Sequence, residues 1–431
     1  MKFKSKIRGW INIFFCFVFL VLIFLFSFKV SQWGVFGTAQ HNLMKNVSGT
    51  AQDLFVSEAL MPWKQIGIEK TFLEKSVNIP ADYACFIVQY INGSLFTSHS
   101  KPDSRNHFPG DLYRSRRKHI LKMLMAAVNS SISILPFEAA FCLGDCVVSD
   151  ISGSLSKHVM NGYPKIADPV AVFTPVKCKG SMNIPFPMWD TAMGDFDHWD
   201  GVVNKIKTNA ARYNWHSKIG KAVFRGGQRT CTIDRGTVKA ITGVNTSPND
   251  VRWKVCGRTA LLYSALTSNY SNYFDVSLTD GHNFNTVLPS PQSLPTHLDM
   301  NLQEKLKHII YVEGHCQWAN RLRRLLFMGS AIIFQDTECV EPYGMLLRPW
   351  IHYIPVDYTF SNLTETMLWA MKHDDEVQLI IQRQNEYADR HVSAAAIRTY
   401  VRRLFEAYSR LLKYEVHLRH DSIRVTTHCD E

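Results

Sequence analysis

Several common catalytic signatures are absent from this sequence. It contains no Gly-x-Ser-x-Gly, His-Glu-x-x-His or P-loop pattern, which excludes the commonest hydrolase and nucleotide-hydrolase classes. Internal repeats and low-complexity tracts are also absent, in agreement with a globular composition that is 46% hydrophobic. Cys142 and Cys146 have no matching second pair of ligands, which argues against a zinc site.

The charge balance of the chain is basic. Its 431 residues include 48 Lys and Arg against 37 Asp and Glu, which gives a net charge of +11. This excess favours an anionic ligand or surface, but it does not distinguish a nucleic acid from a lipid or a nucleotide. The length suits roughly two to three domains.

The N-terminal segment predicts a membrane anchor. Basic residues at positions 2, 4, 6 and 8 precede an apolar run, Gly9–Phe28, which is long enough to span a bilayer. The basic flank is expected to stay cytoplasmic. We therefore expect a cytoplasmic tail at 1–8, a transmembrane signal anchor at 9–28 and a stem at 29–75, as in a single-pass type II protein. A cleaved signal peptide is the alternative, although its hydrophobic region is usually shorter.

Two further features agree with a body that lies in the lumen of the endoplasmic reticulum or Golgi. Asn-x-Ser/Thr sequons occur at Asn46, Asn92, Asn129, Asn245, Asn269 and Asn362. Nine of the ten cysteines follow the apolar run, and an oxidising lumen permits disulfides among them, with the connectivity left open. A lumenal location disfavours a nucleic-acid partner despite the basic charge.

Strand-like and helix-like patterns alternate along the first part of the body. The stretch "ACFIVQYINGSLF" predicts a β-hairpin around its Asn-Gly pair. A helix at "RSRRKHILKMLMAAVNSS" and strands at "FEAAFCLGD" and "DPVAVFTPV" follow. Because a helix lies between strands, we expect a parallel sheet, in a first α/β domain at 76–215.

A second set of alternating elements begins near Lys218. Strands are predicted at "KAVFRGGQRT", "HIIYVEG", "SAIIFQD" and "IHYIPVD", with helices at "GRTALLYSAL" and "CQWANRLRRLLFMG". This order indicates a second, doubly wound domain at 216–385. The amphipathic pattern at 386–431 predicts C-terminal helices that pack across the two domains.

Residues at the predicted strand ends suggest a diphosphate site. Gly314 closes a strand and opens a predicted helix, whose free N–H groups would suit a phosphate. Arg321 and Arg324 are three residues apart on one helix face, and Arg225 ends the neighbouring strand. Asp145 ends a strand of the first domain, so we expect its carboxylate to face a cleft between the two domains. It would act there as a general base, or it would serve only as a helix cap or turn residue.

A metal-dependent site is the competing interpretation. The stretch "DFDHWD" contains Asp195 and Asp197, and an Asp-x-Asp pair can hold a divalent cation on a nucleotide-sugar diphosphate. No apolar strand precedes it, which favours a loop with capping residues.

Three segments together resemble the CAP10-type glycosyltransferase family, which includes fungal capsule xylosyltransferases and the Rumi-like protein O-glucosyltransferases. These are "VFRGGQRT", "KHIIYVEGHCQWANRLRRLLFMGSAIIFQDTECVEPYGMLLRPWIHYIPVD" and "LTETMLWAMKHDD". The resemblance implies a GT-B fold, in which two Rossmann-like domains face a cleft, here preceded by the transmembrane helix. It also implies inverting transfer of glucose or xylose from a UDP-sugar to a hydroxyl of a protein or glycan, without a metal or other cofactor.

The resemblance also assigns roles to individual residues. Arg225 matches the arginine that binds the UDP diphosphate, Arg321 the helix arginine that steadies the same group, and Glu341 an acid near the ribose. Asp145 matches the catalytic base. The expected donor-binding residues are Arg225, Gly226, Gly314, Arg321, Arg324 and Glu341.

A lumenal binding protein that kept this fold and lost turnover is the alternative function. The chain ends in "HCDE", which is not an ER-retrieval tetrapeptide, so Golgi residence is favoured over soluble residence in the endoplasmic reticulum.

Overall fold

The computed structural model describes residues 51–77, 85–98, 110–145, 169–178, 181–189, 196–227, 257–279, 298–314, 318–337 and 339–426. The predicted cytoplasmic tail and signal anchor lie outside these residues. Within the described stretches, no helix is both long and apolar enough to cross a membrane.

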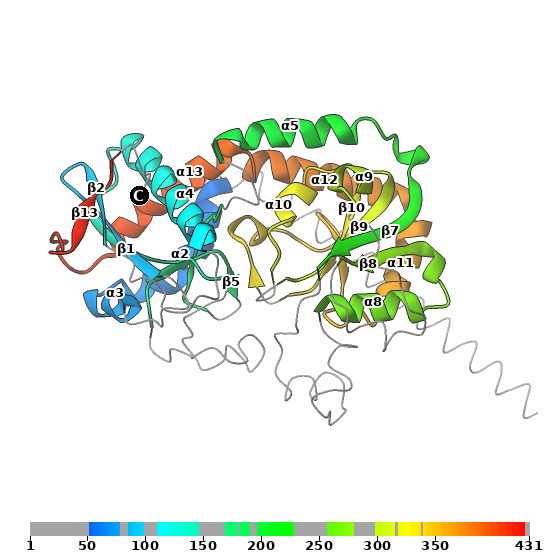
Figure 1. The fold of residues 1–431 in the computed structure, drawn as a ribbon, viewed down its shortest axis with the longest axis horizontal. Helices are drawn as coiled ribbons and strands as arrows, with labels where there is room; N and C mark the ends of the chain where they lie inside the picture. Colours follow the sequence, from blue (N-terminus) through cyan, green and yellow to red (C-terminus); the bar gives the residue numbers. More distant parts are fainter. Residues whose placement is uncertain are drawn as a thin grey trace, which may run out of the picture.

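Two main sheets form the body, one on each side of the view in Figure 1. The first has the strand order β13-β2-β1-β3-β4-β6. Its strands are β1 (Cys85–Ile91), β2 (Ser94–Ser98), β3 (Phe137–Cys142), β4 (Val172–Thr174), β6 (Ile184–Pro185) and β13 (Ser422–Arg424). The first lobe consists of this sheet and four helices, α2 (Ala51–Ile66), α3 (Lys70–Val77), α4 (Gly110–Asn129) and α13 (Ala394–Tyr408).

The predicted hairpin of the first lobe is confirmed. Asn92 and Gly93 join β1 to β2 with φ angles of 49° and 75°, which a tight two-residue hairpin turn requires. The expectation of a parallel sheet is only partly correct. β3 pairs in parallel with β4, but antiparallel with β1. Because the hairpin reverses the chain, helix α4 (Gly110–Asn129) connects β2 to β3, and β1 lies between these two strands.

The second sheet is entirely parallel, with the order β12-β10-β9-β7-β8. Its strands are β7 (Ile219–Gly226), β8 (Phe274–Leu278), β9 (Leu306–Tyr311), β10 (Ala331–Gln335) and β12 (Ile354–Val356). The chain adds β8 on one side of β7 and then returns to add β9 on the other side. The carboxyl ends of β7 and β9 therefore flank a topological switch point, where ligands bind in open α/β sheets.

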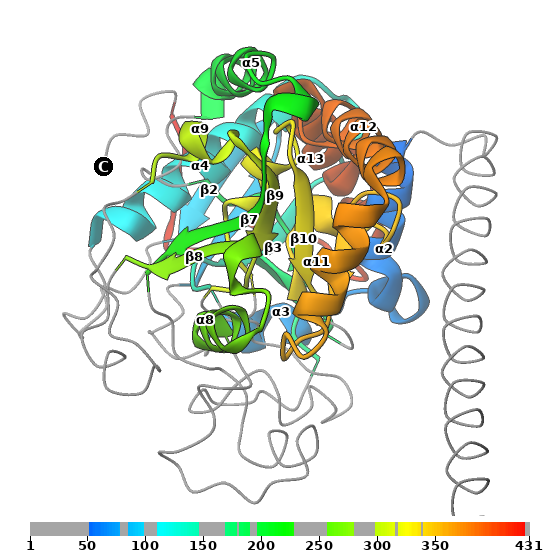
Figure 2. The ribbon, with the colours of Figure 1, turned by 90° about the vertical axis from the view of Figure 1, so that its right-hand side faces the viewer.

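Helices cover both faces of the second sheet (Figure 2). The side chains of Ala222 and Phe224 pack in one apolar cluster with α8 (Gly257–Thr267) and α11 (Leu363–Lys372), whereas Val223 packs in the other with α10 (Leu322–Leu325). The helices of this second lobe are α8 (Gly257–Thr267), α9 (Met300–Gln303), α10 (Leu322–Leu325), α11 (Leu363–Lys372) and α12 (Asp374–His391). This alternation of sides is expected for strands buried on both faces.

Part of the predicted stem belongs to the folded body. Residues 51–77 form α2 (Ala51–Ile66) and α3 (Lys70–Val77), and α2 packs against α13 (Ala394–Tyr408). Trp63 of α2 is fully buried, and its indole N–H donates to the carbonyl of Met182 at 2.8 Å. These apolar contacts come from residues distant in the sequence, which the local pattern did not indicate.

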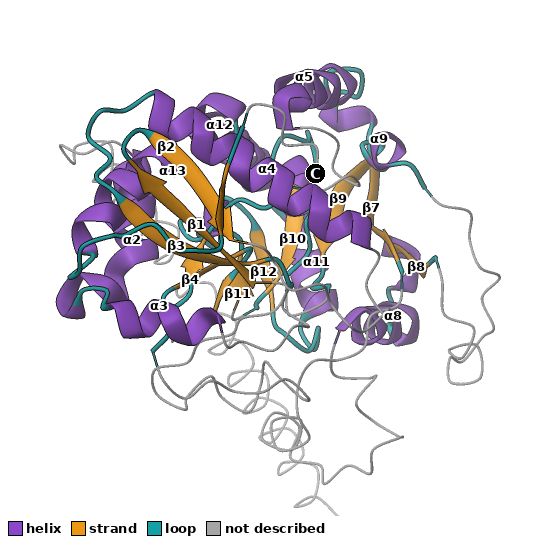
Figure 3. Ribbon diagram, turned by 60° about the vertical axis from the view of Figure 1, so that its left-hand side comes forward, coloured by secondary structure: helices purple, strands orange, loops and turns teal. Residues whose placement is uncertain are grey.

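Covalent and helical connections join the two lobes. A disulfide links Cys178 of β5 (Lys177–Cys178) to Cys339 of β11 (Cys339–Val340), and these short strands pair with each other. Helix α5 (Trp199–Ala210) leads from the first lobe to the second (Figure 1), and it lies beside α9 of the second lobe (Figure 3). A second disulfide, Cys85–Cys142, joins β1 to β3 inside the first lobe.

Candidate active site

Residues of both lobes line one cavity of about 700 Å³. Six of the seven residues singled out from the sequence are in its wall: Asp145, Arg225, Gly226, Gly314, Arg321 and Arg324. The cavity lies at the switch point, because Gly226 ends β7 and Gly314 closely follows β9. The structure therefore brings together predicted residues that are far apart in the chain.

Arg225 is engaged by the edge strand of its own sheet. Its guanidinium donates to the carboxylate and to the carbonyl of Asp275 on β8, both at 2.6 Å. The Arg225 side chain is 12% exposed, so its charge is largely desolvated and compensated by Asp275. Arg225 also contributes its backbone, since its carbonyl accepts a hydrogen bond from Arg321 at 2.8 Å.

A second arginine, Arg258, meets Arg321 above Gly226. A Cβ atom added at Gly226 would lie 2.9 Å from Nη2 of Arg321 and 3.2 Å from Nη1 of Arg258. At Gly314 an added Cβ would lie 3.4 Å from Nη2 of Arg258. The two glycines thus leave room for two guanidinium groups at the ends of β7 and β9. Two like charges held this close favour an anion between or beside them.

Sequence reasoning missed Arg258. Its guanidinium donates to the carbonyls of Gly227 at 2.6 Å and Glu313 at 3.1 Å, and the residue is 6% exposed. One signal was present in the sequence: Arg258 is the only charged residue of helix α8 and lies in its first turn, where the helix dipole disfavours a cation. A basic residue in that position indicates that another interaction holds it there.

The predicted phosphate-binding helix terminus after Gly314 is wrong. Helix α10 begins only at Leu322 and has four residues, and the N–H of Gly314 donates to the carbonyl of Trp318 at 2.8 Å. The hydroxyl of Tyr311 accepts from the N–H of Ala319 at 2.9 Å. The N–H groups of Gly314 and Ala319 therefore already have partners, and residues 315–317 lie outside the described residues.

Glu341 is not among the described residues that line the cavity. It is 2% exposed, and its carboxylate accepts from Arg323 at 3.3 Å and from the hydroxyl of Tyr343. Arg323 itself lies over the ring of Trp189, in the interior. Glu341 of the "VEPYG" stretch therefore forms a buried ion pair with Arg323. The structure does not place it in the cavity wall with the other six predicted residues.

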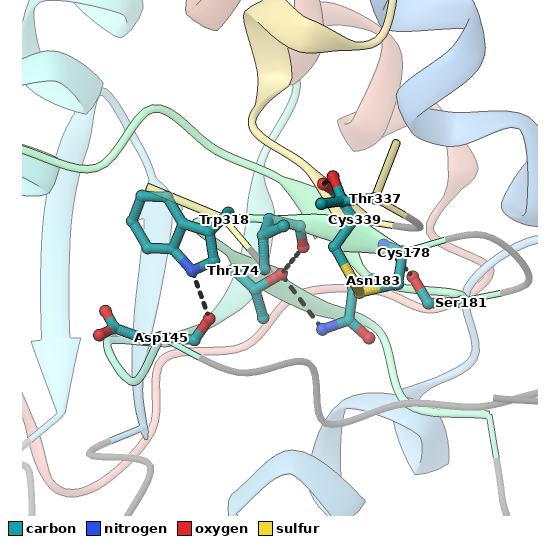
Figure 4. Close-up of a disulfide and its surroundings, with 9 residues drawn as sticks. Asp145, Thr174, Cys178, Ser181, Asn183, Trp318, Thr337 and Cys339 are labelled. Atoms are coloured by element: carbon teal, nitrogen blue, oxygen red, sulfur yellow. Dashed lines mark hydrogen bonds between the residues drawn. A yellow bond between two sulfur atoms is a disulfide. The ribbon is translucent and has the colours of Figure 1, made fainter. Parts of the chain in front are cut away.

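Asp145 is positioned by contacts from both lobes. Arg116 of α4 donates from Nη1 to the Asp145 carboxylate at 2.7 Å and to the Leu143 carbonyl at 2.6 Å. From the second lobe, the indole N–H of Trp318 donates to the backbone carbonyl of Asp145 at 2.9 Å (Figure 4). The side chain of Asp145 remains 30% exposed at the cavity, which suits an acid that meets a substrate.

A second carboxyl, that of Glu313, lies close to Arg258. We call the side of the cavity that carries Arg258 and Arg321 the cationic side. Glu313 is 2% exposed, and burial raises the pKa of its carboxyl to about 7. The hydroxyl of Tyr358 donates to this carboxyl at 2.5 Å and opposes the shift only in part. Below about pH 7 this group is therefore mostly neutral and does not cancel the charge of the neighbouring guanidinium of Arg258.

The described residues contain no cluster of three or more acidic, His or Cys side chains that could hold a metal. Asp197 of the "DFDHWD" stretch lies within ion-pair distance of Lys122 at 3.6 Å and Arg398 at 3.9 Å. Asp195 lies outside the described residues.

Comparison with known proteins then decides the family. The model of the family described as glycosyl transferase family 90 matches residues 51–431. This chain belongs to glycosyl transferase family 90. The match covers most of the chain and confirms the resemblance to CAP10-type proteins inferred from the sequence.

Curated relatives of this family 90 member are distant. Protein O-glucosyltransferase 1 of Mus musculus is 25% identical over 243 residues, covering 56% of this chain and 54% of that protein. Protein O-glucosyltransferase 2 of Danio rerio is 28% identical over 197 residues, covering 46% and 34%. The O-glucosyltransferase rumi homolog of Aedes aegypti is 25% identical over 279 residues, covering 60% of each. The chain thus spans about half the length of several of the curated relatives that it matches.

Proposed function

We propose that this protein is an inverting, metal-independent glycosyltransferase that moves glucose or xylose from a UDP-sugar to a hydroxyl of a protein or glycan. One observation carries the proposal: Arg258 and Arg321 converge at the switch point of the parallel sheet, and Asp145 lies in the wall of the same cavity. Family membership and the names of the relatives support the same chemistry. The two lobes would act as the halves of a GT-B enzyme.

The guanidinium groups would hold the donor diphosphate and stabilise its departure. When the bond from the anomeric carbon to UDP breaks, the electron pair and negative charge move onto the β-phosphate. Groups already fixed in place, as Arg321 is by the carbonyl of Arg225 and Arg258 by those of Gly227 and Glu313, need little reorganisation as this charge develops. Such preorganised donors supply several kcal/mol of transition-state stabilisation, on the order of 3 kcal/mol for one group.

Asp145 would act as the base. As the acceptor oxygen forms its bond to the anomeric carbon on the face opposite UDP, its proton would pass to the Asp145 carboxylate. No metal is needed in this scheme, because the arginines supply the positive charge. The sequence of residues 9–28 supports a single-pass type II protein whose catalytic body lies in the lumen of the Golgi or endoplasmic reticulum.

The experiment that tests this function is a screen of UDP release with UDP-glucose, UDP-xylose and other UDP-sugars. Product masses would be recorded on a panel of glycan and folded-domain acceptors. We expect acceptor-dependent release with one of the first two donors, at the same rate in EDTA. Loss of activity in EDTA would favour a metal site at Asp195 and Asp197 instead. Calorimetric binding of UDP without product on any acceptor would favour the lumenal binding protein.

A matched pair of variants tests whether the arginines of the cationic side bind UDP. Arg321→Met removes the guanidinium and keeps an apolar stem, whereas Arg410→Met makes the same change at an exposed residue outside the cavity wall. A hydrogen bond to a charged group is worth about 1.5–3 kcal/mol, so UDP affinity should fall about 10- to 100-fold in Arg321→Met. Unchanged affinity in that variant would contradict the proposed donor site.

A further inference from the structure

The backbone that carries Asp145 is fixed on its own lobe. The preceding strand, β3, is tied to β1 by the disulfide Cys85–Cys142, three residues before the acid. Arg116, which is 5% exposed, then holds the carboxylate and the nearby Leu143 carbonyl together. These contacts orient Asp145 within the first lobe, but they do not set its distance from the arginines of the second lobe.

A contact from the second lobe supplies that missing constraint. Trp318 is 6% exposed, and its indole N–H reaches across to the Asp145 carbonyl (Figure 4). Its own backbone is fixed at the end of β9, because its carbonyl accepts from Gly314 at 2.8 Å. Three residues further along lies Arg321, which lines the cavity. One short turn therefore carries both a donor-side arginine and the hydrogen bond to the acid.

We propose that Trp318 is a positioning residue that couples the turn after β9 to Asp145 and so sets the base at its working distance from the donor. The inference rests on the proposed function. Trp318 is also in the cavity wall, but the role proposed for it is exerted through its hydrogen bond to Asp145 and is distinct from donor binding. Transfer requires the acceptor oxygen, the base and the anomeric carbon to be correctly positioned relative to one another. A displacement of one of these groups by about 1 Å can lower the rate about 100-fold.

The test compares two Trp→Phe variants with the same chemical loss. Trp318→Phe keeps a ring and removes the N–H that bonds Asp145. Trp199→Phe removes an equivalent buried N–H, which donates to the carbonyl of Val392 at 2.7 Å, and Trp199 does not line the cavity. Both variants should lose about 1–3 kcal/mol of stability from the unsatisfied carbonyl, and the cavity left by the smaller ring adds to the loss in each. Only Trp318→Phe should lose turnover.

The expected result is a split between turnover and binding. In Trp318→Phe, kcat should fall about 10- to 100-fold, while the UDP Kd and the donor KM stay within about twofold of the parent. Amide exchange at residues 143–145 should become faster in Trp318→Phe and remain unchanged in Trp199→Phe. If an active parent gives two variants with equal kcat, or Trp318→Phe loses UDP affinity with kcat intact, the positioning role is overturned. A parent that transfers no sugar overturns the proposed function itself, and this role with it.

Discussion

The two sides of the cavity are built on different principles. On the second-lobe side, two glycines at the ends of β7 and β9 leave space for guanidinium groups, which are held by backbone carbonyls. On the first-lobe side, Asp145 faces the cavity and is held by two side chains: Arg116 donates to its carboxylate and Trp318 to its backbone carbonyl. Under the proposed function, the second side would bind the donor and the first side would supply the base.

The architecture of each sheet explains this division. Every strand of the second sheet points its carboxyl end toward the same edge, so several loops can place donors at one point. The first sheet is mixed, and β3 reaches the cavity with a parallel neighbour, β4, on one side and the antiparallel β1 on the other. Such an edge offers fewer convergent loops, and a lone acid there depends on side-chain contacts for its position.

The largest expected effect comes from Asp145→Asn. This variant is nearly isosteric, can keep a hydrogen bond from Arg116 and removes the base, so kcat should fall by about 10²–10⁴. UDP affinity measured by calorimetry should stay unchanged, because the donor is held on the other side of the cavity. A variant as active as the parent would remove Asp145 from its role, and a parallel loss of UDP affinity would show that the two sides are not separable.

Cutting the covalent link between the lobes should have the next largest effect. The double variant Cys178→Ser, Cys339→Ser opens a link between residues 161 apart in sequence and should cost about 2–4 kcal/mol of unfolding free energy. The matched control, Cys85→Ser with Cys142→Ser, opens a span of 57 residues, and chain entropy alone predicts a loss smaller by about 1 kcal/mol. Urea unfolding measures both losses.

The two disulfides also separate the functions of the two sides. The inter-lobe variant should retain UDP affinity at 25 °C and lose kcat, since Arg258 and Arg321 both belong to the second lobe whereas the base belongs to the first. If this variant loses UDP affinity and keeps the kcat of the parent, donor binding also depends on how the two lobes are held together. The separation of donor binding and base between the two lobes would then be wrong.

The sequence predicted the site residues that lie at strand ends better than those that reach the cavity from other elements. Arg225, Gly226 and Asp145 were found because each ends an apolar strand, which is a local pattern. Arg258 was missed because its partners, Gly227 and Glu313, lie 31 and 55 residues away, and no local pattern specifies them. Tertiary contacts also override local propensity, as in the segment expected to be a long helix, whose described residues form only the four-residue helix α10.

The same limit applied to the first lobe. The Asn-Gly turn predicted the hairpin, but nothing in a local pattern indicates that β1 lies between β2 and β3. Glu341 resembled a ribose-binding acid in its sequence context, yet a buried partner, Arg323, decides its place. Long-range pairing thus determined which of the predicted acids reached the cavity.

The buried carboxyl of Glu313 gives a pH-dependent test of the cationic side. Its pKa of about 7 in the folded protein lies above the value of 4.5 for an unperturbed glutamate. The folded state therefore binds more protons between these values, and this group lowers stability as pH rises until about pH 7. Between pH 5 and pH 8 the parent should lose about 2–3 kcal/mol from this source.

The matched variant for this test is Glu313→Gln, which cannot ionise. Its unfolding free energy should change less between pH 5 and pH 8, so that it gains about 2–3 kcal/mol relative to the parent over that interval. Chemical denaturation at the two pH values measures the difference. Parallel pH profiles for parent and variant would mean that Glu313 is already ionised at pH 5, and that the cationic side carries a compensating negative charge.

The smallest expected effect concerns the space that the glycines provide. In Gly226→Ala, the new methyl group would come within 2.9 Å of both Arg321 Nη2 and Phe224 Cζ, so the guanidinium must shift. We expect UDP affinity to fall several-fold, about 3- to 10-fold, with kcat affected less. Gly201→Ala in α5 is the control, because its added methyl meets nothing within 4 Å and should raise stability by about 0.5–1 kcal/mol without changing affinity. If Gly226→Ala binds UDP as tightly as Gly201→Ala does, UDP binding does not depend on the position of the guanidinium groups at the end of β7. That result would contradict the proposed donor site at Arg258 and Arg321.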